Sequence, residues 1–410
     1  MRNANVLISG AGIAGPLLGW WLRRYGFEPT IVERSPEARP GGQAVDIRGA
    51  ARNVVEQMGL LPDIRAASVR ERGIAFVDER GRIRATMAAD AFGGEGIVAE
   101  IEILRGDLST ILVDATRPDI EYLFDDSITE LVDADDGVRV TFGSGARRSF
   151  DLVIGADGVH SRVRRLTRGD ESAFVRPLGG YTAYFTMAGP PPRGDWFLLY
   201  NAPGGRAAAI RPDREANTKA MLSFRSSQLD DQGDAAEQMR ILEAVFAGVG
   251  WQVPQLLAAM RDARDFHFDT IAQVHMDRWT HKRTALVGDA GYAASHVSGL
   301  GTSLAIVGAY VLAGELANAG GDHTVAFPRY EAELRPYVTQ CQDLPPGGIK
   351  GFLPGSPAAI WMRDQSTSLM TRWPFRLAMR GVFEKADSIS LKDYTGSKER
   401  PLSPSSTGAK

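Results

Sequence analysis

The sequence of 410 residues contains one cysteine, Cys341. A single thiol excludes an intrachain disulfide and a metal cluster held by cysteines, and it fits a reducing compartment. The six histidines are scattered, without the short spacing that is typical of a metal site. We therefore expect a cytoplasmic protein that holds no metal.

An excess of either charge is also missing, since 47 lysines and arginines stand against 50 aspartates and glutamates. This balance gives no reason to expect nucleic acid or an anionic membrane as a partner. Long apolar runs are lacking as well: the longest, residues 304–316, contains Glu315 and is too short to cross a bilayer. The first residues lack the apolar segment of a signal peptide. Residues 395–410 are rich in Ser, Pro and charge, which predicts a flexible tail.

The chain begins with a strand, a glycine turn and a helix. Residues 6–8 form a short apolar run typical of a strand buried on both faces. In the turn that follows, Gly10 permits the bend, Gly12 lets backbone amides approach a pyrophosphate, and Gly15 lets the helix pack on the strand. The helix that begins at Ala14 would offer its positive N-terminal end to phosphates.

An acidic residue closes this first unit. Glu33 ends the second predicted strand, eighteen residues after Gly15. A carboxylate at this place hydrogen-bonds a nucleotide ribose and repels a 2′-phosphate. Glu33 therefore favours the ADP half of FAD or NAD over NADP, and Arg34 weakens that exclusion. A glycine-rich loop without nucleotide is the alternative, because the glycine spacing alone is a weak signal.

Further glycine motifs follow predicted buried strands or precede a predicted helix: Asp157-Gly158, Gly288-Asp289 and Gly299-Leu300-Gly301. The carboxyl ends of parallel strands are where an open α/β sheet places its ligand groups. Backbone amides at a helix N-terminus would stabilise negative charge on such a ligand.

Between these motifs lie a charged residue in an apolar setting and an inserted set of strands. Arg105 stands at the start of a predicted helix. It either contacts a cofactor or forms a surface salt bridge with Asp107. A loop with paired glycines, including Gly42, is a candidate to cross the nucleotide site. Residues 174–269 show strands and turns whose aromatic side chains either fill a core or line a cavity. The pocket candidates are Tyr184, Phe197 and Phe224.

In combination, these motifs resemble the group A FAD-dependent monooxygenases, which share the para-hydroxybenzoate hydroxylase fold. The glycine turn with Glu33 fits the first motif of that family, and residues 157–164 fit the second, which serves both FAD and NAD(P)H. Gly288-Asp289 fits the third, whose aspartate contacts the flavin ribityl chain. Arg105 lies where the family has an arginine beside the flavin. The compact chain is most similar to tetracycline-inactivating and antibiotic-tailoring aromatic hydroxylases.

The resemblance implies an α/β fold with a Rossmann-like FAD-binding domain of the GR2 type, an inserted antiparallel-sheet substrate domain and C-terminal helices. The FAD-binding domain is expected in three parts, residues 1–75, 100–172 and 273–340. The substrate domain is expected to combine a hairpin, residues 76–99, with the sheet of residues 173–272. A helical segment, residues 341–394, and the tail complete the chain.

The resemblance also implies the chemistry. NADPH or NADH reduces FAD, O₂ adds at flavin C4a to form a hydroperoxide, and one oxygen atom passes to an aromatic or polyketide-like small molecule. A Baeyer–Villiger or epoxidising outcome of the same chemistry stays open. A flavin halogenase is disfavoured because residues 251–254 carry only a fragment of the Trp-x-Trp-x-Ile-Pro signature. A flavin-binding protein without turnover is the alternative of another class.

One position departs from the family pattern. The family usually has a proline where this chain has His296, three residues before Gly299. An imidazole there is either a titratable group beside the reactive edge of the flavin or a structural filler. His296 is the candidate catalytic residue on this basis.

Overall fold

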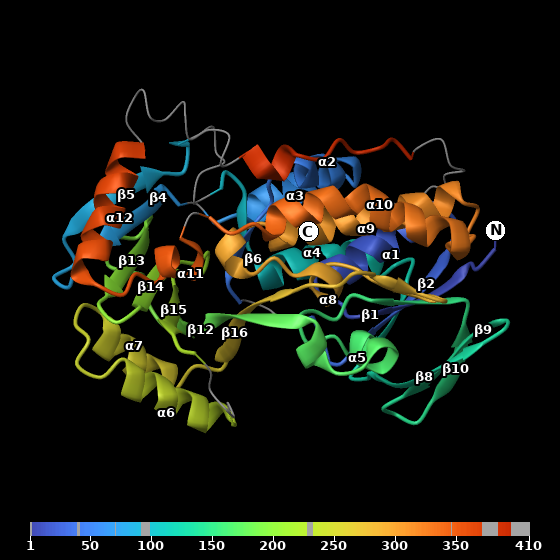
Figure 1. The fold of residues 1–410 in the computed structure, drawn as a ribbon, viewed down its shortest axis with the longest axis horizontal. Coiled ribbons are helices and arrows are strands. Elements are labelled where there is room, and N and C mark those ends of the chain that lie inside the picture. Colours follow the sequence, from blue (N-terminus) through green and yellow to red (C-terminus); the bar gives the residue numbers. More distant parts are fainter. Residues whose placement is uncertain are drawn as a thin grey trace, which may run out of the picture.

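The computed structural model describes residues 2–38, 42–69, 71–91, 99–227, 233–345, 347–370 and 384–394. The expected tail, residues 395–410, lies outside these ranges, as do residues 39–41 of the glycine loop and 92–98 of the expected hairpin segment. The described elements form two parts that lie side by side along the long axis of the molecule (Figure 1). We name them the six-stranded part and the seven-stranded part after their main sheets.

The six-stranded sheet has the order β17-β18-β11-β1-β2-β7. All of its strands pair in parallel except the edge strand β17. The carboxyl ends of five adjacent strands therefore share one edge, and Glu33 and three of the predicted motifs stand at or just after four of these ends. The strands are Thr280–His281 (β17), Thr284–Leu286 (β18), Leu152–Gly155 (β11), Asn5–Ser9 (β1), Glu28–Glu33 (β2) and Glu121–Phe124 (β7).

Helices cover this sheet, and the apolar helix α9 (Gly301–Asn318) is buried along most of its length. It packs against α1 (Ala14–Arg24), α2 (Ala50–Gln57) and α10 (His323–Gln342). None of the described helices is long and apolar enough to cross a membrane. The remaining helices of this part are α3 (Leu61–Ala67), α4 (Arg105–Thr116), α5 (Arg162–Arg168) and α8 (Asp289–Tyr292), with short turns η2 (Glu171–Ala173) and η3 (His296–Ser298).

Two smaller sheets complete the six-stranded part. Strands β3 (Ala44–Asp46) and β6 (Glu102–Leu104) form an antiparallel pair that leads directly into α4. Strands β8 (Ile128–Ala134), β9 (Gly137–Phe142) and β10 (Arg147–Phe150) form a three-stranded sheet at the end remote from the seven-stranded part (Figure 1).

The seven-stranded sheet combines distant segments of the chain. Its order is β16-β12-β15-β14-β13-β4-β5, antiparallel except for the parallel pair β13 and β4. The hairpin β4–β5 thus extends the sheet formed by the later strands. The strands are Gly73–Val77 (β4), Ile83–Ala88 (β5), Val175–Met187 (β12), Phe197–Ala202 (β13), Arg206–Pro212 (β14), Thr218–Arg225 (β15) and His267–Val274 (β16).

The two faces of this sheet differ in what covers them. One face packs on α6 (Ala235–Val245) and α7 (Val253–Met260) and carries Phe224. The other face, with Tyr184 and Phe197, packs toward η3, α11 (Gly348–Phe352) and α12 (Pro357–Met370). Since side chains alternate along a strand, neighbouring aromatic residues belong to different cores.

The prediction that Phe224 lines the pocket is therefore wrong. Its side chain is 2% exposed, stacks on Tyr181 with ring centroids 5.6 Å apart and meets Phe246 in an edge contact. These contacts place Phe224 in the core beneath α6 and α7.

The last described residues, 384–394, pack back on the six-stranded part, and we name them the C-terminal strap (Figure 1, red). It begins with the short turn η4 (Glu384–Asp387). The Tyr394 hydroxyl donates a hydrogen bond to the buried Glu315 carboxylate at 2.9 Å, and Lys392 Nζ donates another at 3.1 Å. The strap thus supplies partners for the one acidic residue within the apolar helix α9.

Candidate functional site

The glycine turn after β1 has the geometry that its sequence predicts. Gly10 has φ of 108°, and a Cβ there would lie 2.6 Å from the carbonyl oxygen of Ala156. A Cβ on Gly15 would lie 1.9 Å from the carbonyl oxygen of Gly10. At Gly12 the nearest atom is Arg105 Nη2, at 3.7 Å from such a Cβ. Packing therefore requires the first and third glycines, whereas a Cβ at the second would make only an ordinary contact with a side chain.

Two helices begin at this edge of the sheet without a side-chain cap. Neither Ile13 before α1 nor Leu300 before α9 caps its helix, and neither helix has an acidic residue in its first turn. The first amides of a helix have no partner within the helix, and they carry its positive end. By contrast, Ser161 caps α5 and Asp322 caps α10. The uncapped ends of α1 and α9 suit an anionic ligand.

Glu33 is held beside the glycine turn. Its carboxylate accepts hydrogen bonds from the amides of Ala11 at 2.8 Å and Ser35 at 2.9 Å. These bonds fix the carboxylate at the end of β2, next to the start of the turn. Arg34 is exposed.

Arg105 and Asp289 are both exposed, and each approaches a different glycine of the candidate site. A Cβ on Gly42 would lie 3.8 Å from Arg105 Cβ, and a Cβ on Gly301 would lie 3.8 Å from Asp289 Oδ1. Nearby protein atoms desolvate Asp289 and raise the pKa of its carboxyl, while the charge of Arg105 acts in the opposite direction. Asp107, the alternative partner of Arg105, instead lies 3.9 Å from Arg214.

Gly288 of the third motif and Gly299 before α9 complete the set of glycines at this site. Gly288 has φ of 64°, and a Cβ there would lie 3.2 Å from Ala14 Cβ. Gly299 adopts the left-handed conformation that ends η3, with Asp46 Oδ2 at 3.6 Å from a hypothetical Cβ. The structure thus brings together residues from six segments, and we call this set the cradle: residues 10–15, Glu33, residues 42–46, Arg105, residues 288–289 and residues 299–301. Asp46 is a member that sequence reasoning missed. Its position directly after the glycine loop was the available signal.

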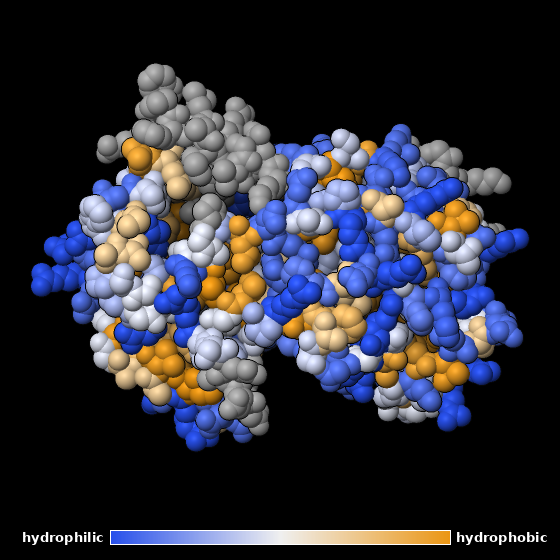
Figure 2. All heavy atoms as spheres, in the orientation of Figure 1, coloured by the Kyte–Doolittle hydropathy of each residue, from blue (hydrophilic) through white to orange (hydrophobic). Residues whose placement is uncertain are grey.

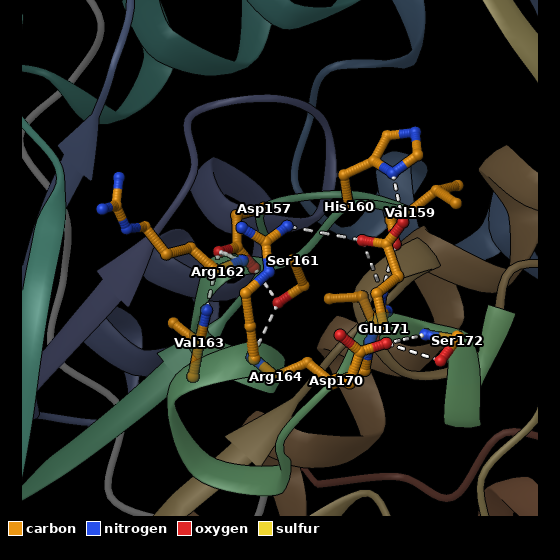
Figure 3. A network of polar contacts seen from close by, with 12 residues as sticks. Asp157, Val159, His160, Ser161, Arg162, Val163, Arg164, Asp170, Glu171 and Ser172 are labelled. Carbon is orange, nitrogen blue, oxygen red and sulfur yellow. Dashed lines mark hydrogen bonds and ion pairs between the residues drawn. The ribbon is translucent and has the colours of Figure 1, made fainter. Parts of the chain in front are cut away.

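The Asp157 motif, in contrast, is folded inward (Figure 3). The Asp157 carboxylate accepts hydrogen bonds from the Ser161 hydroxyl at 2.5 Å and from the amides of Arg162 and Val163 at 2.8 and 3.1 Å. Burial raises the pKa of Asp157, although these hydrogen bonds oppose the shift. Asp157 therefore organises the start of α5, and only the backbone around Gly158 is left to contact a cofactor.

Arg164 of the same motif is also internal. Its side chain is 1% exposed and donates hydrogen bonds to the carbonyls of Ala290 at 2.8 Å and Val159 at 2.5 Å. The arginine thereby connects the second motif to the residue after Asp289. The Arg164 guanidinium is therefore held inside the protein and not offered to a phosphate.

His296 lies between the two parts of the molecule. Its ring makes edge contacts with Tyr184 and Phe352, with centroids 6.1 and 6.0 Å apart. Burial lowers the pKa of His296 to about 4, so the imidazole is neutral at physiological pH. Its Nε2 is buried and, among the described residues, has no hydrogen-bond partner.

Comparison with known proteins agrees with this geometry. The model of the FAD binding domain family matches residues 3–344. A flavin-dependent monooxygenase of an unknown prokaryotic organism is 39% identical over 397 residues, which cover 96% of this chain and 100% of the relative. The chain is a group A FAD-dependent monooxygenase.

Two further proteins are similar to this monooxygenase over most of its length. An uncharacterized protein of Mycobacterium tuberculosis is 45% identical over 352 residues, which cover 85% of this chain and 94% of the relative. The crystal structure of tetracycline destructase Tet(55) has 37% identity and a TM-score of 0.81, and it covers 96% of this chain and 100% of its own. The fold predicted from the sequence is thereby confirmed.

The cradle of this monooxygenase fits FAD. A Cβ on Gly12 would meet only the Arg105 side chain at an ordinary contact distance, two helices present uncapped N-terminal ends, and the side chains of Arg105 and Asp289 are exposed. Figure 2 shows hydrophobic side chains beside charged ones where the two parts of the molecule meet. The apolar cluster that includes Tyr184 and Val297 adjoins the cradle at Gly299, as a cofactor with a nucleotide half and a planar ring system requires.

Proposed function

We propose that this monooxygenase uses NADPH or NADH and O₂ to hydroxylate an apolar, aromatic or polyketide-like small molecule. One observation carries the proposal: the sheet face with Tyr184 meets His296 of η3, three residues from the Gly299–Gly301 end of the cradle. An apolar wall and a cofactor cradle are thus joined in one site. Bound FAD supplies the redox chemistry, and the protein supplies position, charge and exclusion of water.

Different residues of the cradle would contact different portions of the cofactor. The turn at Gly10 and the start of α1 would hold the pyrophosphate, and Glu33 the adenosine ribose. Arg105 and Asp289 would hold the middle of the cofactor. The proposed set is Gly10, Gly12, Ala14, Gly15, Glu33, Arg34, Gly42, Arg105, Asp157, Gly158, Gly288, Asp289, Gly299, Leu300 and Gly301, with Asp157 acting through the backbone that it orders.

The N-terminus of α9 would stabilise negative charge next to Gly299. Leu300 provides no side-chain cap, so the first amides of this 18-residue helix are left for a ligand. His296 would add a neutral hydrogen-bonding group through Nε2. Its lowered pKa argues against proton donation at neutral pH, and we therefore assign it to substrate positioning.

The opposite wall of the site would be the apolar sheet face. It would be formed by Tyr184 and Phe197, which are partly buried and belong to one hydrophobic cluster with Val297 of η3. A wall of this kind excludes water from the reacting atoms and favours substrates with flat, apolar surfaces.

The test measures substrate-stimulated oxidation of NADPH and NADH, O₂ uptake and product mass across aromatic polyketides, with tetracyclines among them because of the related destructase. We expect O₂ uptake that matches NAD(P)H oxidation and a product heavier by one oxygen. Product structure then separates ring hydroxylation from a Baeyer–Villiger ester or an epoxide. A purified protein that takes up no FAD would overturn the proposal.

Two phenylalanines on opposite faces give a matched control. Phe197→Leu should raise KM or hydrogen peroxide release several-fold, because it changes the wall of the site. Phe224→Leu removes similar volume beneath α6 and α7 and should lower stability only. Equal effects of both variants on turnover would place the substrate elsewhere.

A further inference from the structure

Two carboxyl groups face each other across the β3–β6 pair. Asp46 is the direct cross-strand partner of Glu102, and their side chains are 13% and 5% exposed. Like charges directly opposite each other in a sheet are destabilising. A proton on one of the two carboxyls removes this repulsion and supplies a donor for a hydrogen bond between them.

The surrounding charges lead to the same conclusion. Arg211 of β14 donates hydrogen bonds to both oxygens of Glu71 at 2.7 Å and to Glu102. Arg48 donates to Asp46 from Nε at 3.0 Å and from Nη2 at 2.7 Å. Among the described residues, this buried cluster joins three acids to two guanidiniums. With one retained proton the cluster becomes neutral, whereas a net buried charge is expensive.

Burial supports this assignment. It raises the pKa of Glu102 well above its usual value, and Asp46 and Glu71 raise it further, against the opposing charge of Arg211. Burial lowers the pKa of Arg211, but Glu102 and Glu71 outweigh burial and raise it, so the guanidinium stays charged.

The cluster connects the two parts of the molecule at the cradle. Asp46 lies beside Gly299, and the amide of Arg48 donates a hydrogen bond to the Ser303 hydroxyl of α9 at 3.1 Å. On the other side, the Arg211 guanidinium lies 4.8 Å from the ring centroid of Phe197. Glu71, whose side chain is 1% exposed, lines a hollow of about 370 Å³ next to the cluster.

We propose that Asp46 and Glu102 share one proton and, through Arg211, hold the wall of the site in register with the flavin end of the cradle. Neither acid is assigned contact with substrate. They are positioning residues, and loss of the shared proton weakens the link between the two parts of the molecule.

The first test compares Glu102→Gln, Glu102→Ala and the control Glu100→Gln, all as FAD-loaded protein in the same excess of FAD. Glu100 is exposed and belongs to the same segment. A group with a raised pKa in the folded state keeps its proton there and loses it on unfolding, so stability falls as pH rises. The unfolding constant of the wild type and of Glu100→Gln should therefore rise about tenfold more per pH unit than that of Glu102→Gln, from about pH 5 to the folded pKa.

The magnitude near pH 4, where an unfolded glutamate is itself mostly protonated, separates the shared proton from an ion pair. Glutamine imitates a protonated glutamate, so at this pH Glu102→Gln should unfold with a constant within about threefold of the wild type, given the usual size of a balanced hydrogen-bond exchange. At neutral pH the same variant should unfold with a smaller constant than the wild type, because it has no proton to lose on unfolding. Glu102→Ala leaves partners unsatisfied and should raise the constant at least tenfold, or about 1.4 kcal/mol. If Glu102→Gln is as damaging as Glu102→Ala and keeps the pH slope of the wild type, Glu102 is ionised and the proposal is wrong.

Infrared spectroscopy tests the proton directly. The carbonyl band of a protonated carboxylic acid should be present at pH 7 in the wild type and in Glu100→Gln, and absent in Glu102→Gln. An unchanged band in Glu102→Gln would also overturn the proposal. Neither experiment needs turnover, so their failure is distinct from failure of the proposed function. Product formed per NAD(P)H should fall several-fold in Glu102→Ala and be restored in Glu102→Gln.

Discussion

Asp157 and Asp289 occupy equivalent places in the fold, since each follows a strand of the same parallel sheet, β11 or β18, and these strands are neighbours. Their surroundings differ. Asp157 binds the Ser161 hydroxyl and the first amides of α5, whereas Asp289 is exposed toward Gly301 and Arg105. The comparison teaches that a motif aspartate can act on a cofactor directly or by shaping the chain that touches it.

The cause of the difference lies in the residues that follow. Four residues after Asp157, Ser161 caps a seven-residue helix and donates its own hydroxyl back to the aspartate. Asp289 is itself the first residue of α8, whose cap Gly288 has no side chain to offer. A buried carboxylate with several donors is stabilised where it is, and an exposed one is available to a ligand.

The largest effect is expected from Asp157→Ala. Removal of this carboxylate leaves the Ser161 hydroxyl and two helix amides without their acceptor, at a cost of about 3 kcal/mol in the free energy of unfolding. Urea unfolding of the FAD-loaded protein measures it. A variant of normal stability that fails to bind FAD would make Asp157 a direct ligand and break the comparison.

A smaller effect, on FAD affinity and not on stability, is expected from Asp289→Asn. The change keeps the shape of the side chain but removes its charge beside Arg105, so FAD affinity should fall about tenfold, or about 1.4 kcal/mol. Stability without added FAD should change by less than about 0.5 kcal/mol, as for other exposed positions. Quenching of flavin fluorescence during titration measures the affinity, and unchanged affinity would leave Asp289 without the proposed role.

The smallest effect concerns His160, in the loop after Asp157. Its Nδ1 contacts Glu171 at 2.8 Å (Figure 3), and its Nε2 contacts Asp269 at 3.2 Å. Hydrogen bonding to Asp269, then the charges of both acids, raise the pKa of His160 to about 9 against the effect of burial. The raised pKa stabilises the folded state fully below about pH 6.5 and loses this contribution as pH rises to about 9.

Since the His160 side chain is 52% exposed, solvent screening limits this contribution to less than about 1 kcal/mol. His160→Gln should reduce the fall in stability between these pH values. The matched comparison is His267→Gln, an exposed histidine of β16 at 3.8 Å from Asp269. If both variants reduce the pH dependence of stability equally, the contacts of His160 contribute no more to stability than the contact of His267.

Much of the fold could be predicted from the sequence because its signals are local. The turn at Gly10, the long apolar helix and the strands that end in aspartate each have a period or a glycine spacing that one segment reveals. The family match and the two-sheet architecture agree with that reading.

The rest depended on contacts between distant segments. Which face of the sheet Phe224 occupies is decided by α6 and α7, and the neutrality of His296 by its burial near Tyr184 and Phe352. The pairing of Asp46 with Glu102 joins residues 56 positions apart along the chain, at the register that the β3–β6 pair sets. No local pattern carries such information.

The C-terminal strap also changes where the first folding unit ends. The family match stops at residue 344, yet Tyr394 packs so closely on α9 that a Cβ on Gly314 would lie 2.3 Å from its ring. The Tyr310 hydroxyl donates a hydrogen bond to the carbonyl of Lys392 at 2.7 Å, which ties the strap to the same helix. A chain that ended at residue 344 would lack the strap, and Glu315 would lose its tyrosine and lysine partners. A cofactor-binding unit prepared on its own should therefore include residues 384–394, which follow α11 and α12 in the sequence.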